Sequence, residues 1–261
     1  MQKEFMKNYN SKLLIVIPFY NESGRGSKFC EELIKEFDNH FSDFQFYLID
    51  DSSTDDTYLE LSSFFEKYKG NTILIKNNKN LGHGPSIVSG YEYGYNNAYD
   101  YVVQIDGDNA AEPNSIASLI KFAITGEFNL TLGKRINRPD AFIRKLITFV
   151  LYLNLYFRFG VIAKDSNVGI RVLSKKYLNL LPFEKMKELN IPNAFITAHS
   201  FYLDKTKTAI TPVIMRMNIE TGREGEQWGS GSDIKSIMKL LRGAYNCFIE
   251  VNTKFKKIIH G

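Results

Sequence analysis

Two aspartates stand two residues apart in this chain, in the Asp-Gly-Asp segment at residues 106–108, directly after the apolar run at residues 101–105. A short run rich in β-branched residues predicts a buried strand, and Gly107 allows the chain to turn sharply at its end. Mg²⁺ and Mn²⁺ prefer hard oxygen ligands, often one or two carboxylates together with substrate phosphates. Asp106 and Asp108 therefore predict a site for a divalent cation facing a diphosphate; the alternative is an Asp-Gly turn with solvated carboxylates.

The surrounding pattern predicts the elements that would position this pair. Apolar runs alternate with segments of helical spacing, which favours βαβ units around a mainly parallel sheet and hence an α/β fold. The expected strands are residues 13–17, 44–49, 72–75, 101–105, 128–132 and 209–218, and residues 165–173 have turn and strand character. The expected helices lie near residues 27–40, 54–69, 85–98 and 233–251. Another helix is expected to begin at Pro113, because proline suits the first helical turn.

A polar segment follows the first strand, at the sheet edge where open α/β proteins bind ligands. Pro18 stiffens the exit from the strand, Tyr20 offers a face on which a base can stack, and Glu22 offers an acceptor to a base or ribose. The alternative is a structural turn with a half-buried tyrosine.

Two further polar segments follow the second and third strands. Asp50 and Asp51 either bind a ring amide or are solvated, and residues 53–56 have the spacing of a capping box that would begin the next helix. Gly82 and Gly84 flank His83 before a helix and allow close approach of the backbone to a ligand, while His83 itself is expected to be a surface or packing residue. The spacing is neither a dinucleotide fingerprint nor a P-loop, so those enzyme classes lose support.

Taken together, the segments I-P-F-Y-N-E, D-D-S-S-T-D-D-T, N-L-G-H-G and D-G-D resemble those of family-2 inverting glycosyltransferases of the GT-A fold, over about residues 12–135. The resemblance implies a mainly parallel sheet with a Rossmann-like nucleotide-binding half and a helical elaboration on the acceptor side. It implies Mg²⁺ or Mn²⁺ as cofactor, held by Asp106 and Asp108. It also implies a nucleotide-sugar donor, bound by Pro18, Tyr20, Glu22, Asp50, Asp51, Asn80, Gly82 and Asp106.

The second half is similar to the polyprenyl-phosphate branch of that family, typified by dolichyl-phosphate mannose synthase. Residues 133–135 and 165–171 resemble the segments that surround the acceptor phosphate there, which implies that Arg135 and Arg171 bind the acceptor. Two features depart from that branch: Val168 replaces a small hydroxyl residue, and residues 109–111 replace a continuation that supplies a glutamine.

Asp165 is the candidate catalytic base alongside Asp106 and Asp108. A sugar hydroxyl acceptor needs a base near the anomeric carbon, whereas an ionised phosphate attacks without losing a proton. The alternative for Asp165 is a carboxylate paired with Arg171 or capping a turn.

The composition is that of an ordinary globular protein, with 261 residues, 44% hydrophobic and 24% charged. The formal charge of +4 is small and dispersed, so nucleic acid is not expected as a partner. Cys30 and Cys247 lack metal-ligand spacing, which predicts reduced thiols. Residues 1–12 show no apolar signal-peptide core, so we expect a cytoplasmic protein.

Residues 146–163 form the longest apolar run, but Asn154 and Arg158 interrupt it, so no membrane span is expected. Residues 138–163 and the basic C-terminal tail are instead candidates for peripheral contact with the inner face of a membrane. The alternatives are a core helix and a solvated basic face.

We expect a polar extension at residues 1–11, a catalytic domain at residues 12–218 and a flexible loop with a basic helix at residues 219–261. The catalytic domain would divide into a nucleotide-sugar half (12–135) and an acceptor half (136–218). The expected activity is transfer of a hexose to a polyprenyl phosphate, or otherwise to the hydroxyl of a cell-surface glycan. Two alternatives are not glycosyltransferases: a nucleotidyltransferase, and a non-catalytic module that binds nucleotide sugars or glycans. The glycine-rich segment at residues 221–232 is expected to be a mobile loop, in which residues 223–228 form a lid over the donor; the alternative is that Trp228 anchors the loop to the core.

Overall fold

The computed structural model describes residues 9–136, 142–216 and 234–260. One sheet of seven strands, in the order β3-β2-β1-β4-β6-β5-β7, runs through the described part of the chain. The strands are β1 (Leu13–Phe19), β2 (Phe44–Asp50), β3 (Thr72–Lys76), β4 (Tyr101–Gln104), β5 (Leu130–Ile136), β6 (Arg171–Ser174) and β7 (Thr208–Ile214). β6 runs antiparallel to β4 and β5, and the other strand pairs are parallel. The predicted mainly parallel α/β sheet is confirmed.

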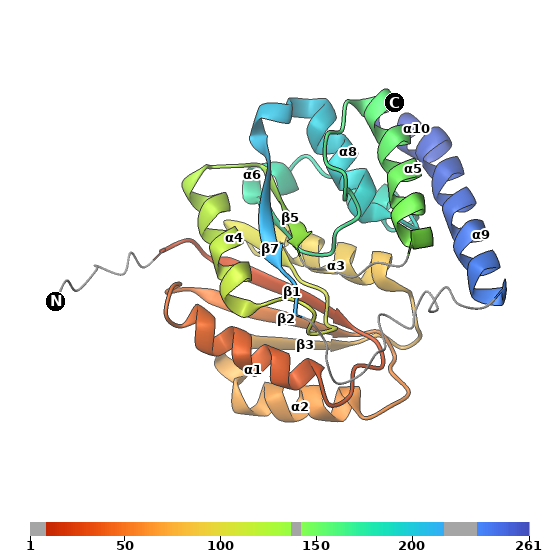
Figure 1. Ribbon diagram of the computed structural model, residues 1–261. Coiled ribbons are helices and arrows are strands. Elements are labelled where there is room, and N and C mark those ends of the chain that lie inside the picture. The colour runs from red at the N-terminus through yellow and green to blue at the C-terminus, as the bar shows by residue number, and fades with distance from the viewer. Residues whose placement is uncertain (1–8, 137–141, 217–233, 261) are drawn as a thin grey trace.

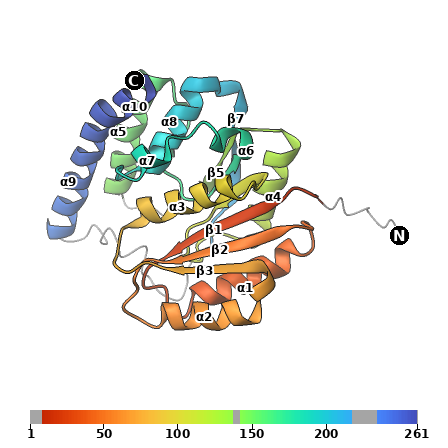
Figure 2. The ribbon, with the colours of Figure 1, turned by 180° about the vertical axis from the view of Figure 1, so that it is seen from behind.

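Helices cover both faces of this sheet, giving three layers (Figures 1 and 2). One face carries α1 (Gly26–Phe37), α2 (Thr57–Lys67) and α4 (Pro113–Thr125). The other carries α3 (His83–Asn96), α6 (Lys175–Leu178), α7 (Phe183–Met186) and α8 (Pro192–Asp204). α5 (Phe142–Phe159) lies beyond α8, beside α9 (Ile234–Glu250), and the remaining short elements are η1 (Lys69–Asn71), η2 (Lys205–Lys207), η4 (Val251–Phe255) and α10 (Lys256–His260).

β1, the third strand in the sheet order, is buried along its whole length, because helices cover it from both sides. α3 approaches β1 and its neighbour β4 closely through two glycines one helical turn apart. A Cβ added at Gly90 would lie 2.3 Å from Cγ1 of Val16, and one at Gly94 would lie 2.3 Å from Cγ2 of Val102. Only glycine permits this approach, which brings the N-terminal end of α3 to the same sheet edge as the two aspartates.

Two details of the helices differ from the sequence predictions. The capping box predicted at residues 53–56 does not form: Ser53 Oγ accepts from the Asn21 N–H (3.1 Å), and Asp55 Oδ1 accepts from the N–H of Thr57, where α2 begins (3.0 Å). α8 had no sequence prediction, because residues 192–201 are all buried and the helix therefore lacks an amphipathic period. The predicted loop at residues 221–232 and the lid within it lie outside the described residues.

A buried carboxylate fastens the C-terminal helices to the body of the protein. Glu250, at the end of α9, accepts from the backbone N–H groups of Asn190 (2.9 Å) and Ile191 (3.1 Å), directly before the start of α8. A negative charge at this position complements the positive end of the α8 dipole and satisfies N–H groups that the helix leaves unpaired. This contact fixes α9, and the neighbouring α5, relative to the sheet.

A buried histidine in α8 gives a prediction for stability. Burial lowers the pKa of His199 to about 4, from 6.5, and its ring stacks on Phe195. As the pH falls, His199 becomes protonated below about pH 6.5 in the unfolded chain but only below about pH 4 in the folded chain. The free energy of unfolding therefore falls by about 3 kcal/mol between pH 6.5 and pH 4. His199→Phe should remove this loss. Chemical denaturation of both proteins between pH 7 and pH 4 measures the difference; parallel pH profiles would contradict it.

Candidate active site

Three strands end side by side at the edge that carries the predicted chemistry. β1 lies between β2 and β4, and Phe19 at the end of β1 pairs with Asp50 at the end of β2. The polar segments after these strands therefore converge. The Asp51 N–H donates to Phe19 O (2.8 Å), and the Glu22 N–H donates to Thr57 Oγ1 (2.7 Å), which fixes the first two segments to each other.

The two aspartates form a closely interacting pair. Asp106 is partly exposed, whereas burial and then the charge of Asp106 raise the pKa of Asp108 to about 6. Oδ1 of Asp108 accepts from the Ala110 N–H (3.1 Å). Two carboxylates that repel each other at a sheet edge have the hard oxygen atoms that Mg²⁺ or Mn²⁺ requires. The described residues contain no group of three or more His, Cys, Asp or Glu side chains that could hold a metal.

Two residues that the sequence did not assign to the site contact Asp106. His83 Nε2 lies 2.9 Å from Asp106 Oδ1, although His83 was expected to be a surface or packing residue. Gly169, in the segment before β6, packs directly on the same carboxylate: a Cβ there would lie 1.8 Å from Asp106 Oδ2. The place of His83 at the start of a helix after the third strand was the feature that could have revealed it. Nothing local marked Gly169, because the contact depends on β6 pairing with β4.

Glu22 lies within the electrostatic reach of the pair. Burial raises the pKa of Glu22 to about 7, Arg25 opposes this rise, and Asp108 adds to it. Arg25 Nη2 lies 2.8 Å from Glu22 Oε2. Tyr20, two residues earlier, is half-buried, and Pro18 is buried within β1. The structure thus brings Pro18, Tyr20 and Glu22 to the aspartate edge as one segment.

The two aspartates at the end of β2, Asp50 and Asp51, are buried rather than solvated. Asp51 accepts from Asn77 Nδ2 (2.7 Å) and from the N–H groups of Leu81 (2.9 Å) and Gly82 (2.8 Å), so it organises the loop before α3. The Gly82 N–H also donates to Asn80 Oδ1 (3.0 Å). Asp50 Oδ2 accepts from the Ser53 N–H (3.3 Å), while Oδ1 is buried without a hydrogen-bond partner among the described residues.

The predicted acceptor residues occupy two different environments. Arg135 Nε and Nη2 lie 2.7 Å and 2.6 Å from Asp165 Oδ2, and the Arg135 charge also acts on Asp108. Arg171 is completely buried and donates to the carbonyls of Val168 (3.0 Å) and Asn193 (2.8 Å). It therefore has no surface with which to contact an acceptor, and the expected role is corrected to a structural one. Asp165 forms its ion pair with Arg135, not with Arg171 as the alternative interpretation of the sequence predicted.

The chain is similar to known proteins in both sequence and fold. Residues 14–187 match the profile of glycosyl transferase family 2. The chain is 24% identical to an uncharacterized protein of Methanocaldococcus jannaschii, over 87% of this chain and 96% of that protein. It is 28% identical to the UDP-N-acetylglucosamine–dolichyl-phosphate N-acetylglucosaminyltransferase of Methanococcus voltae, over 65% and 72% of the two chains. The glucosyl-3-phosphoglycerate synthase of Mycobacterium tuberculosis, solved with Mn²⁺ and UDP-glucose, shares the fold with a TM-score of 0.62 at 18% identity, over 91% and 79% of the chains.

Proposed function

The chain belongs to glycosyl transferase family 2 and has the GT-A fold, and from this premise we propose that it transfers a hexose, with inversion, from a nucleotide sugar to a polyprenyl phosphate. The observation that carries the proposal is the convergence of Glu22, Asp106 and Asp108 at one sheet edge, with Arg135 and Asp165 beside them. The name of the relative from Methanococcus voltae includes dolichyl phosphate, which supports the class of acceptor proposed.

The carboxylates at this sheet edge fit a divalent cation. Asp106 and Asp108 would hold Mg²⁺ or Mn²⁺ together with the donor diphosphate, because two neighbouring carboxylates offer hard oxygen atoms at a cost of mutual repulsion that a cation relieves. The cation would act as a Lewis acid that neutralises the charge growing on the leaving nucleoside diphosphate. His83 and Gly169 orient Asp106 from two sides, one by hydrogen bonding and one by contact.

The base and ribose would lie over the segments that follow β1 and β2. Tyr20 is half-buried and retains a face for a base, and Glu22 supplies an acceptor. Asp50 has a buried oxygen without a partner among the described residues, which supports a direct contact with the donor. Asp51 is already bonded to the loop at residues 77–82, so we assign it the role of shaping this wall, together with Asn80 and Gly82.

The acceptor phosphate would meet Arg135. Its charge acts on Asp108, and Asp165 holds the guanidinium through a single carboxylate oxygen. A guanidinium binds phosphate through paired N–H donors, so an incoming phosphate can share or replace Asp165. In this arrangement Asp165 orients Arg135, and the chemistry requires no proton to leave the acceptor.

The role of Asp165 gives a test that separates the acceptor classes. With a phosphate acceptor, Asp165→Asn should lower kcat by no more than about 10-fold, because no base is needed; with a sugar hydroxyl, loss of a general base costs about 10²-fold to 10⁴-fold. Arg135→Ala should be the more damaging variant for a phosphate and should act mainly on the KM of the acceptor. Steady-state kinetics of both variants measure this order, and the reverse order would favour the glycan alternative.

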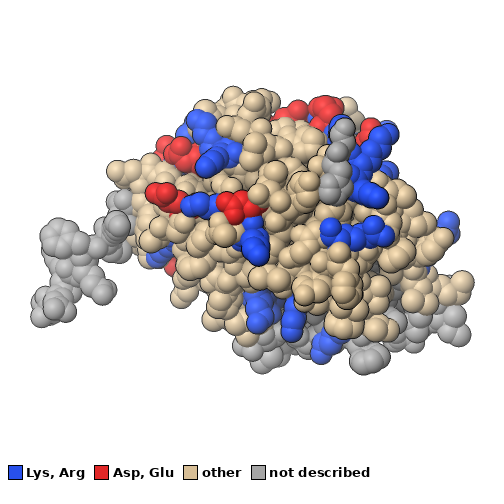
Figure 3. Space-filling view, turned by 90° about the horizontal axis from the view of Figure 1, so that it is seen from above, with Lys and Arg blue, Asp and Glu red and all other residues tan. Residues whose placement is uncertain are grey.

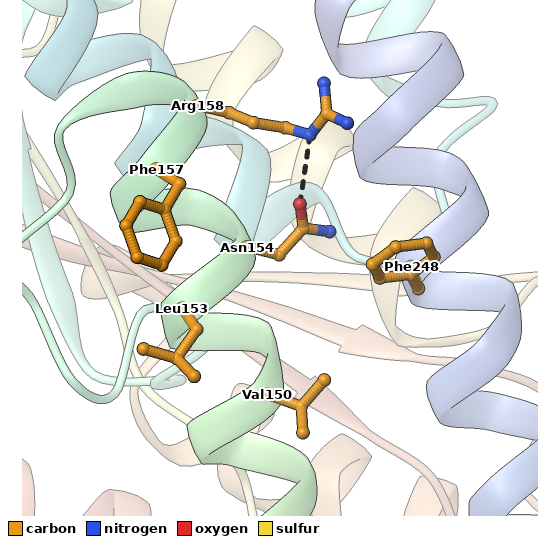
Figure 4. A pocket seen from close by; sticks show the side chains of 6 residues that line it. All are labelled: Val150, Leu153, Asn154, Phe157, Arg158 and Phe248. Atoms are coloured by element: carbon orange, nitrogen blue, oxygen red, sulfur yellow. Dashed lines mark hydrogen bonds between the residues drawn. The ribbon is translucent and has the colours of Figure 1, made fainter.

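The surface formed by α5 and α9 supports contact with a lipid. Between the helices lies a hollow of about 570 Å³ lined by Val150, Leu153, Asn154, Phe157, Arg158 and Phe248 (Figure 4). Phe157 is 79% exposed, and Met238 and Tyr245 are each 65% exposed. Figure 3, a view from above relative to Figure 1, shows Lys and Arg side chains together with Asp and Glu side chains, scattered over a largely uncharged surface. No described helix is both long and apolar enough to cross a bilayer. We propose peripheral contact of this surface with the membrane that holds the acceptor.

The function is tested by supplying the full chain with Mn²⁺, radiolabelled UDP- and GDP-hexoses and a polyprenyl phosphate dispersed in detergent. The proposal predicts label in the organic phase, on a product that mild acid cleaves as a glycosyl phosphate. Omission of Mn²⁺ or of the lipid should abolish it. Label transferred only to an added oligosaccharide would support the glycan alternative, and donor binding without transfer to either would support a non-catalytic module.

A further inference from the structure

The turn that follows the two aspartates is held by an arginine from far along the chain, and we propose that Arg216 is a positioning residue for the metal ligand Asp108. The inference rests on the proposed metal-dependent function. Arg216 follows β7, and its side chain is only 21% exposed. Neither its charge nor its position marked it in the sequence, because the contact arises from the pairing of β7 with β5 at the sheet edge.

The backbone makes the first connection. Met215 forms an antiparallel bridge with Ala111, and the Arg216 N–H donates to Ala110 O (2.7 Å). The N–H of Ala110 in turn donates to Oδ1 of Asp108 (3.1 Å). Ala110 is therefore bonded on one side to the metal ligand and on the other to Arg216, so a shift of the chain after β7 moves the partner of the Asp108 carboxylate.

The side chain makes the second connection. One guanidinium nitrogen of Arg216 donates to Asn109 Oδ1, another donates to Glu32 in α1, and Nε lies 3.5 Å from Glu112 Oε1. Asn109 has a φ of 57°, a left-handed conformation that asparagine tolerates better than most residues. The planar guanidinium, with donors on several sides, can reach Asn109 and Glu32 at once, which a lysine ammonium on its single stem cannot do with the same geometry.

This contact matters because Asp106 and Asp108 stand two residues apart and must face the same cation. If the turn after Asp108 shifts, the Asp108 carboxylate loses its hydrogen bond with the Ala110 N–H, and the two-carboxylate arrangement that a cation needs is then lost. Partners that orient metal ligands typically contribute about 10-fold to 100-fold in metal affinity.

The test measures the Mn²⁺ concentration that gives half of the thermal stabilisation produced by UDP and GDP supplied together. Arg216→Ala and Arg216→Lys should each raise this concentration by about 10-fold, while Arg216→Lys keeps the ligand-free Tm near that of the wild type through its ion pair with Glu32. Glu32→Gln is the matched control, since it removes that ion pair without touching the turn, and it should leave the Mn²⁺ requirement unchanged.

A double-mutant cycle tests the route through the turn. Asn109→Gly keeps the left-handed conformation accessible but removes the contact with Arg216, so it should also raise the Mn²⁺ requirement by about 10-fold, and the double variant Asn109→Gly, Arg216→Ala should add little. Unchanged Mn²⁺ requirements in the Arg216 variants, or fully additive effects in the cycle, would overturn the inference while the proposed function stands. Absence of any Mn²⁺-dependent stabilisation in the wild type would overturn both.

Discussion

Asp108→Asn is expected to lower glycosyl transfer by about 10³-fold, because it removes one of the two carboxylates proposed to hold the cation that neutralises the leaving diphosphate. The fold should persist, since the amide oxygen of asparagine can still accept from the Ala110 N–H. Without metal, the variant should melt a few degrees above the wild type near neutral pH. The reason is that burial and Asp106 raise the pKa of Asp108, so the charged wild-type side chain destabilises the folded state.

Asp38→Asn is the matched control, because Asp38 is an exposed carboxylate at the end of α1, and its replacement removes a charge outside the site. The control should keep both the transfer rate and the Mn²⁺-dependent stabilisation by nucleotide. An Asp108→Asn protein with the Mn²⁺-dependent stabilisation of the wild type would remove Asp108 from the metal site.

Gly169→Ala is expected to lower transfer by about 100-fold although it adds a single methyl group. The new Cβ would lie 1.8 Å from Asp106 Oδ2, so the carboxylate must move by more than an ångström, and displacements of this size cost about 10²-fold in rate. Asp106 then also loses its hydrogen-bond geometry with His83. Steady-state kinetics at saturating Mn²⁺ measure the loss.

Gly70→Ala provides the comparison, because a Cβ at Gly70 meets nothing within 4 Å. It should change neither the rate nor the Tm appreciably. A Gly169→Ala enzyme with unchanged kcat and an unchanged Mn²⁺ requirement would show that Asp106 adapts freely, and would weaken the assignment of Asp106 as a fixed ligand.

The sheet and the donor edge could be predicted because the information for them is local. Apolar runs such as residues 13–17 are continuous where helices cover both faces of the sheet, and the Asp-Gly-Asp segment stands directly at a strand end. α8 could not be predicted, since burial on all sides removes the periodicity that distinguishes a helix. The predicted start of α2 was wrong, because Ser53 Oγ accepts a hydrogen bond from the Asn21 N–H instead of capping its own helix.

The contacts that complete the site depend on tertiary pairing, and the sequence did not reveal them. Gly169 reaches Asp106 because β6 runs antiparallel beside β4, and Arg216 reaches Asn109 because β7 ends near the turn after β4. Arg171 shows the opposite case: its place in a motif suggested an acceptor contact, but three-dimensional packing buries its guanidinium against backbone carbonyls. A motif gives the chemistry of a side chain but not its accessibility.

The central claim is that a metal-dependent nucleotide-sugar site lies at the ends of β1, β2 and β4. Its most direct test measures the thermal stabilisation of the wild type by a panel of nucleoside diphosphates and nucleotide sugars, each with and without Mn²⁺. Selective binding to the folded state raises the Tm. We expect saturable stabilisation by nucleotides of one base, with a strong requirement for Mn²⁺. Stabilisation by no nucleotide, or stabilisation that Mn²⁺ does not affect, would contradict it.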